Sequence, residues 1–212
     1  MSERAAEPPE SQESPGRPRP PGLTLTSYDG KPYRFDPGAL CLELLTTGGP
    51  GAFARYEVLH QPADLAAWAA RSRLPDGLEV SVSNRELTRA RTVRDALFRL
   101  TAARAHGRRL DPLDLDVVNA AAAEPPLVAR ISPDGTHVWA PGATATALLS
   151  TVARDAVDLF TGPHAGRIRV CDAHDCHLLF VDTSRPGRRR WCAMEHCGNR
   201  EKARAHRSRG RA

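Results

Sequence analysis

The strongest hydrophobic pattern in the chain is helical and lies between residues 84 and 160. From Leu87 to Leu100, apolar residues recur every three or four positions, which predicts one long amphipathic helix ending near Ala105. Ser83 and Glu86 precede this stripe and have the spacing of a capping box. Shorter helices are predicted at 64–71, 111–123 and 144–160.

Period-two patterns beside turn residues predict two small β-hairpins. Their strands would be 24–28 with 33–35, and 127–131 with 137–140. Residues 53–60 have the composition of a further strand. Because helices dominate and the sheets are small, we predict the α+β class, with a mainly helical N-terminal domain.

Four of the five cysteines lie close to the C-terminus with the spacing C-x4-C-x15-C-x4-C. Two close pairs separated by an insert of hairpin size are typical of a tetrahedral zinc site with four thiolate ligands. We therefore predict one Zn²⁺ per chain. The predicted ligands are Cys171, Cys176, Cys192 and Cys197. His174, His177 or His196 could replace one cysteine, since histidine also binds zinc. The isolated Cys41 stands in an apolar run and is expected to be a small buried residue.

The residues around the two cysteine pairs predict a zinc-ribbon or treble-clef-like finger. Residues 178–181 form an apolar strand, 183–187 have turn chemistry, and 188–191 would return as a second strand. Gly198 would allow a sharp turn, and Asn199 would cap a helix that runs to about residue 209.

The finger also resembles a known family. The residues WCAM at 191–194 and CGNR at 197–200 are similar to the signature of the CGNR zinc-finger family, and 180–185 and 202–204 fit it as well. In that family an N-terminal ABATE domain precedes the finger. Its members are described as stress-induced transcription regulators, and a related description has them as zinc-ribbon proteins that bind RNA. The resemblance implies this domain order, a zinc ion and a regulatory role.

Positive charge is concentrated in the predicted finger. The whole chain has a net charge of +5, yet residues 163–212 hold 12 Arg or Lys and 5 Asp or Glu, whereas 1–162 hold 18 and 20. This asymmetry is typical of a nucleic-acid contact. The predicted contacts are Arg188, Arg189, Arg190, Lys202, Arg204, Arg207 and Arg209. Asn199, Arg200, Trp191 and Asp182 are predicted to brace the cysteine turns, with Arg200 packing on Trp191 or pairing with Asp182.

These patterns predict three segments: a tail at 1–22, the helical domain at 23–162 and the finger at 163–212. The sequence has no apolar run long enough for a membrane span and no signal peptide, so a cytoplasmic protein without a membrane partner is expected. The motifs GxxxxGK[ST], GxGxxG, GxSxG and HExxH are absent, which argues against the commonest enzyme classes. The sequence does not indicate an oligomeric state.

We interpret the protein as a non-enzymatic, zinc-dependent nucleic-acid-binding regulator, with DNA favoured over RNA. Phe180 and Trp191 are the only aromatic residues of the finger and are expected in its core, so base stacking is disfavoured. The helical domain would sense a small effector or mediate assembly. The alternatives are RNA binding, a protein-interaction or redox-sensing zinc module, a zinc-stapled structural cap with solvated charge, and an enzyme in the helical domain, which would need a concave pocket with convergent polar groups.

Overall fold

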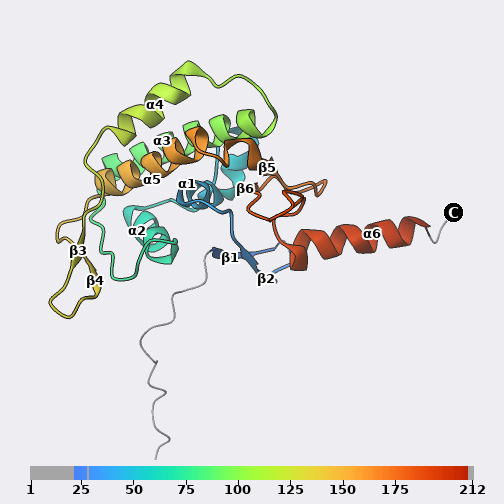
Figure 1. Cartoon of the computed structure of the whole chain (residues 1–212), viewed down its shortest axis with the longest axis horizontal. Helices are drawn as coiled ribbons and strands as arrows, with labels where there is room; N and C mark the ends of the chain where they lie inside the picture. Colours follow the sequence, from blue (N-terminus) through green and yellow to red (C-terminus); the bar gives the residue numbers. More distant parts are fainter. Residues whose placement is uncertain (1–21, 28, 210–212) are drawn as a thin grey trace, which may run out of the picture.

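The computed structural model describes residues 22–27 and 29–209, without the side chains at 205, 208 and 209. The predicted tail therefore lies outside the described residues, apart from Gly22. Helices α3 (Asn84–Ala105), α4 (Pro112–Ala122) and α5 (Ala145–Thr161) pack together, with α1 (Leu40–Leu44) and α2 (Pro62–Arg71) alongside (Figure 1). The α+β class and the mainly helical domain are confirmed.

Side-chain caps begin the main helices where the sequence predicts them. Ser83 Oγ accepts from Glu86 N at 3.3 Å, and the Glu86 carboxylate accepts from Ser83 N at 2.9 Å, which completes the predicted capping box of α3. Asp111 Oδ1 accepts from Leu113 N at 2.9 Å and begins α4. Helix α2 starts earlier than predicted, because Pro62 is favourable in a first helical turn.

The described residues contain three two-stranded antiparallel sheets. The two predicted hairpins are present, and a third pair joins segments on either side of the first two cysteines. In the first pair, Leu23 stands opposite Phe35. The pairs are β1 (Leu23–Thr26) with β2 (Pro32–Phe35), β3 (Ala129–Ile131) with β4 (His137–Trp139), and β5 (Ile168–Val170) with β6 (Leu179–Val181).

The strand predicted at 53–60 is wrong. Residues Gly51–Tyr56 form a 3₁₀ helix, η2. The chain then runs to α2 in an extended segment that pairs with no strand of the described residues. A strand needs a neighbouring edge to satisfy its backbone groups. Here Val58 N bonds back to Thr47 O at 3.0 Å instead, which closes a compact loop.

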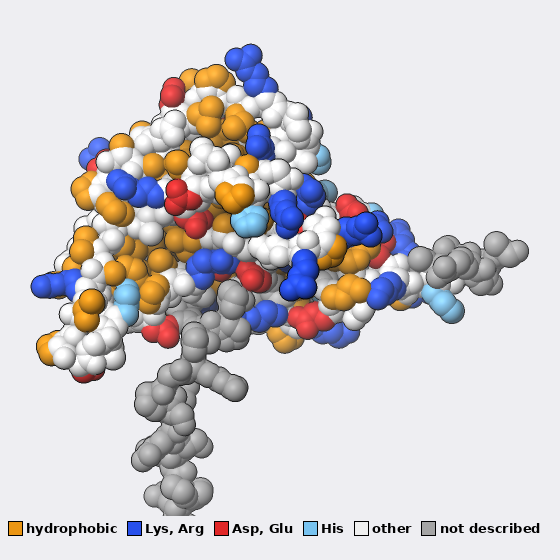
Figure 2. Space-filling view, in the orientation of Figure 1, with side chains coloured by type: hydrophobic (Ala, Val, Ile, Leu, Met, Phe, Trp, Pro, Cys, Tyr) orange, Lys and Arg blue, Asp and Glu red, His pale blue; other side chains and the backbone are white. Residues whose placement is uncertain are grey.

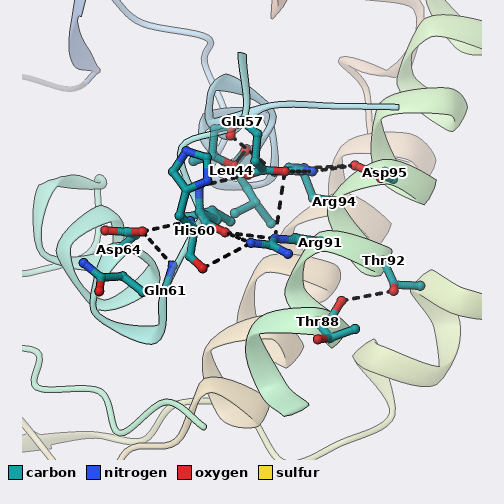
Figure 3. Close-up of polar contacts among 12 residues, drawn as sticks. Leu44, Glu57, His60, Gln61, Asp64, Thr88, Arg91, Thr92, Arg94 and Asp95 are labelled. Carbon is teal, nitrogen blue, oxygen red and sulfur yellow. Dashed lines mark hydrogen bonds and ion pairs between the residues drawn. The ribbon is translucent and has the colours of Figure 1, made fainter. Parts of the chain in front are cut away.

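A buried arginine holds this loop on α3 (Figure 3). Arg94 donates from Nη1 and Nη2 to Glu57 Oε1 and Oε2, at 2.7 and 2.8 Å. Arg91, one helical turn earlier, donates through Nε to Leu59 O at 2.9 Å. Gly48 has a φ of +137°, and a Cβ atom there would lie 2.8 Å from Arg94 Nη1, so the close approach requires glycine.

The hydrophobic core is shared across the predicted domain boundary. Ile168, Leu179 and Val181 from β5 and β6 are buried in the main core together with the helices. A second cluster places Phe35 of β2 beside Phe180 and three of the finger cysteines. The N-terminal hairpin therefore packs on the finger, and the first strands of the finger pack on the helices.

Candidate zinc centre and nucleic-acid interface

The first cysteine pair lies on the turn that connects β5 and β6. Cys171 N donates to Leu178 O at 2.9 Å, and Cys176 N donates to Ala173 O at 3.0 Å, so the two sulfurs sit on one tight turn. The predicted pairing of 178–181 with 188–191 is wrong. The partner of β6 is β5, and residues 188–191 are irregular.

The buried carboxylate of Asp182 orders the loop that follows β6. Asp182 Oδ1 accepts from Ser184 N at 3.0 Å, and Oδ2 accepts from Arg189 N at 2.9 Å. Burial raises the pKa of Asp182, but these hydrogen bonds outweigh burial and hold it below the ordinary value. The irregular segment beyond the loop is attached to the first cysteine turn, because Asp172 N donates to Arg190 O at 2.9 Å.

In the second cysteine pair, Cys192 precedes η4 (Met194–Gly198) and Cys197 lies within it. This single π-helical turn continues into α6 (Asn199–Arg209). The predicted N-cap at Asn199 is wrong, because this residue has helical angles of −67° and −38° and continues the preceding turn. Gly198 makes no left-handed turn. A Cβ there would overlap the sulfur of the exposed, flexible Met194 side chain and lie 3.1 Å from Trp191 Cδ1, so a substitution requires these side chains to shift.

These two turns bring the four predicted cysteine sulfurs together. All four Sγ atoms lie within 4.8 Å of one another, with 3.8 Å from Cys176 to Cys192 and 3.4 Å from Cys192 to Cys197. A tetrahedral zinc ion with Zn–S distances of about 2.3 Å separates its sulfurs by about 3.8 Å. The cluster therefore fits one zinc ion, and no histidine belongs to it.

The crowding of these sulfurs itself favours a cation. Hydrogen bonds with Cys171 and Cys176, together with burial, raise the pKa of Cys192 far above the ordinary thiol value. Hydrogen bonds from Cys176 and Cys192 lower the pKa of Cys171 to about 2. One thiolate thus suppresses ionisation of its neighbours, and four thiolates can coexist here only with a metal ion between them.

Arg200 contacts the cysteine turns by a route the sequence does not predict. Its Nη2 pairs with Asp175 Oδ1 and lies 3.6 Å from Cys197 Sγ. The expected contact with Asp182 or Trp191 is replaced, because Asp182 is occupied by its own loop and the Trp191 ring is covered by Arg190, whose Cζ lies 4.8 Å from the ring centroid. Arg200 therefore joins the first turn of α6 to the first cysteine turn.

The side chain of Arg189 is held by the protein itself. Its Nε donates to Trp191 O at 3.0 Å, Nη1 donates to Asp36 O at 3.0 Å, and Nη2 donates to Cys192 O. Its Cζ lies 4.2 Å from the centroid of the Phe180 ring. The structure therefore gives this predicted nucleic-acid contact a bracing position between finger and hairpin.

The other predicted contacts with described side chains are exposed on the finger and on α6. These are Arg188, Arg190, Lys202, Arg204 and Arg207. Arg190 Nε pairs with Asp172 Oδ2 at 2.8 Å, and Arg204 Nη1 lies 2.5 Å from His174 Nδ1. The side chain of Arg209 lies outside the described residues. Basic side chains gather over the finger and the base of α6 in Figure 2.

A shallow groove of about 790 Å³ runs beside the second cysteine turn. Arg188 and Arg190 line it, and so does Arg34 from strand β2 of the N-terminal hairpin. Sequence reasoning missed Arg34, because the contact between hairpin and finger joins residues far apart in the chain. The available signal was the alternation along the strand: Tyr33 and Phe35 pack on the finger cluster, so Arg34 between them points to the opposite face.

The fold and the site define a class: a helical α+β domain joined to a four-cysteine zinc finger. Residues 38–163 match the ABATE family model, whose description reads "Putative stress-induced transcription regulator", and residues 167–210 match the CGNR zinc finger. The first match spans more than half of the chain, so the protein belongs to the ABATE family. A search of curated proteins gave no match.

Neither family is described as an enzyme. No helix in the described part of the chain combines the length and apolar character that a bilayer crossing requires.

Proposed function

We propose that this protein is a DNA-binding transcription regulator that acts in the cytoplasm and contacts phosphates through α6 and the arginines beside its base. One observation carries the proposal. Helix α6 leaves the finger directly after the ligand Cys197 and projects away from the body of the molecule, with Lys202, Arg204 and Arg207 exposed (Figure 1).

Helix α6 has no apolar face that intramolecular packing would require. It adjoins η4, the turn that precedes it, and its contacts with the first cysteine turn are polar ones made by Arg200, Glu201 and Arg204. Isolated helices of this length are marginal in water, and most helices in proteins are stabilised by packing of an apolar stripe. A projecting helix with basic residues is instead suited to a polyanionic partner, which would neutralise it and order it further.

Duplex DNA fits the described finger better than single-stranded RNA. Recognition of single strands relies on exposed aromatic side chains on which bases stack. Phe180 is fully buried, and Trp191 is half-buried beneath Arg190. Phosphate contacts by exposed arginines need no such stacking and apply to a duplex.

The zinc ion would act through structure and not through chemistry. When bound, it joins both cysteine turns and supplies folding free energy on the order of 10 kcal/mol. Four thiolates complete a tetrahedral shell and leave no position for a substrate, as in structural sites. In this chain the ion would therefore fix the direction in which α6 leaves the finger.

The test is selection of bound sequences by zinc-loaded protein from a random duplex DNA pool, with a single-stranded RNA pool in parallel. We expect enrichment from the duplex pool. A variant with Lys202, Arg204 and Arg207 all changed to Ala should lose binding at least 100-fold while keeping its zinc. A matched variant with Arg85, Arg108 and Arg130 changed to Ala, three exposed arginines outside the finger, should bind like the parent.

Enrichment from the RNA pool alone would overturn the choice of DNA. Equal binding by the triple variant and the parent would remove α6 from the interface. The protein-interaction or redox alternative would then gain support if mild peroxide released the zinc.

A further inference from the structure

A cavity of about 530 Å³ lies where the helical domain, the N-terminal hairpin and the finger meet. Its volume falls within the range of small-molecule sites. Among its apolar lining residues are Leu45, Phe53 and Phe98 from the helical domain, Leu25 and Tyr33 from the hairpin, and Leu178 from the finger. No role assigned above uses this cavity.

Aromatic rings shape the walls of the cavity. Phe53 and Phe98 lie with ring centroids 4.6 Å apart, and His177 of the finger meets the Phe53 ring edge-on at 5.5 Å. On the hairpin side, Tyr33 stacks on His196 at 4.2 Å. Such walls favour a flat aromatic ligand, which can make offset or edge contacts with the rings on both sides.

The charges that line the cavity leave one cation without an acidic partner. Glu57 is paired with Arg94, and Asp175 is paired with Arg200. Arg55 contacts the Tyr56 ring, with Cζ 4.7 Å from the centroid, and forms no ion pair with a carboxylate among the described residues. A ligand with a single negative charge would therefore complement the lining.

We propose that this cavity binds a small aromatic monocarboxylate, with the ring between Phe53 and the hairpin and the carboxylate at Arg55. The proposal extends the proposed function, because it supplies the effector of the same regulator. The cavity wall includes the zinc ligand Cys176 and the α6 residue Arg200. A ligand there contacts the helical domain and the finger together, so it favours the arrangement of finger and α6 that closes around it.

The first test is calorimetric titration of the zinc-loaded full chain with 2-naphthoate and with its neutral analogue 2-naphthamide. We expect 2-naphthoate to bind with a Kd on the order of 100 µM, as expected for a ligand of this size. The amide should bind at least tenfold more weakly. The variant Arg55→Gln should abolish that difference, whereas Arg85→Gln, an exposed arginine on α3, should retain it.

The second test measures zinc release to a chromogenic chelator, which needs no nucleic acid. Saturating 2-naphthoate should slow the release at least threefold in the parent and leave it unchanged in Arg55→Gln. Equal affinity for the acid and the amide, or unchanged selectivity in Arg55→Gln, would overturn the proposal. The two proposals can fail separately. A protein that binds 2-naphthoate but no DNA contradicts only the proposed function, and one that binds DNA but not 2-naphthoate contradicts only the ligand proposed for the cavity.

Discussion

Arg189 Nη1 donates to the backbone carbonyl of Asp36 at 3.0 Å and thereby joins two residues separated by 153 positions. This bond fastens the finger to the end of the N-terminal hairpin. Strands β5 and β6, which the first cysteine turn connects, place Ile168 and Val181 in the main core. The sequence predicts a domain boundary near residue 162, but the main core includes residues beyond it.

We therefore predict that a fragment of residues 22–162 is destabilised. It lacks Ile168, Leu179 and Val181, whose burial contributes roughly 5 kcal/mol in total. Urea denaturation followed by circular dichroism should show a loss of that order relative to the full chain. A fragment ending at residue 183 keeps β5 and β6 and should recover part of the difference. Equal stability of the shorter fragment and the full chain would support the boundary predicted from sequence.

Helix starts could be predicted from the sequence because they depend on residues close together in the chain. Ser83 and Asp111 mark helix starts because their side chains satisfy backbone amides a few residues away, which is visible in a short window. The choice of strand partner is not local. Leu179 and Val181 pack in the main core and Phe180 in the finger cluster, so β6 needs a partner that borders both clusters, and β5 occupies that position.

The zinc content depends on four cysteines and not on the fifth. We expect one zinc per purified chain, and Cys192→Ser should lose the metal because the shell then lacks one thiolate. Cys41→Ala is the matched control, since Cys41 is equally buried but belongs to the helical core. Elemental analysis checks both variants. Full zinc retention in Cys192→Ser would contradict the ligand set.

The Glu57–Arg94 pair gives a stability contribution that depends on pH. Burial raises the pKa of Glu57, but hydrogen bonds from Arg94 and from Leu59 N outweigh it, and the net shift is downward. A lowered pKa means that the contribution is complete above the unfolded value of about 4.3 and is lost as pH falls through the folded value. Glu57→Gln should cost about 2 kcal/mol at pH 7, because the buried Arg94 loses its bidentate partner and keeps its ion pair with Asp95 alone.

The comparison is made by urea denaturation of parent and variant at pH 7 and near pH 3. The difference in unfolding free energy between them should shrink at the lower pH, because the contribution of Glu57 is lost as pH falls through its lowered folded pKa. Glu79→Gln, at an exposed position, controls for loss of a surface carboxylate. A difference that does not change with pH would show that the ion pair is not its source.

Gly198 is predicted to be favoured by its close approach to Met194 and Trp191. Gly198→Ala should lower zinc affinity about threefold, because the new methyl group displaces the exposed Met194 side chain and presses on the Trp191 ring. The double variant with Met194→Ala should recover most of the loss, since the overlap is relieved. Gly166→Ala, where a Cβ meets nothing within 4 Å, is the control. Competition with a zinc chelator measures each affinity, and a double variant as weak as Gly198→Ala would exclude this contact as the cause.

The metal ligands could be predicted because cysteine spacing alone indicates them. The partners of the arginines could not, because they depend on which segments pack together in the fold. Four cysteines in two pairs specify a metal shell, and their sulfurs do converge. The partner of Arg200 was not visible, because Asp175 becomes its neighbour only when the first cysteine turn folds against α6. The same long-range packing turns Arg189 from an expected phosphate contact into a clamp on the hairpin.

The last prediction separates bracing from binding on α6. Arg200 is paired with Asp175 and lies near Cys197 Sγ, whereas Arg207 is exposed farther along the helix. Arg200→Ala should therefore speed zinc loss to a chelator, and Arg207→Ala should leave zinc retention unchanged. As salt rises, the logarithm of the DNA affinity falls by about 0.9 per log unit of salt for each phosphate contact. Arg207→Ala should reduce the salt slope of DNA binding by about one and weaken all sequences alike, as expected for a phosphate contact.

Fluorescence anisotropy with labelled duplex DNA over a series of salt concentrations measures the slope, and two sequences suffice to test uniformity. If Arg207 reads a base, its removal would instead relax preference at one position by about 1–3 kcal/mol. If Arg200→Ala and Arg207→Ala both bind DNA and RNA as well as the parent, the charge of α6 is a solvated face. Either outcome can be interpreted only if Arg207→Ala keeps its zinc. A misfolded finger would lose zinc binding and DNA binding together.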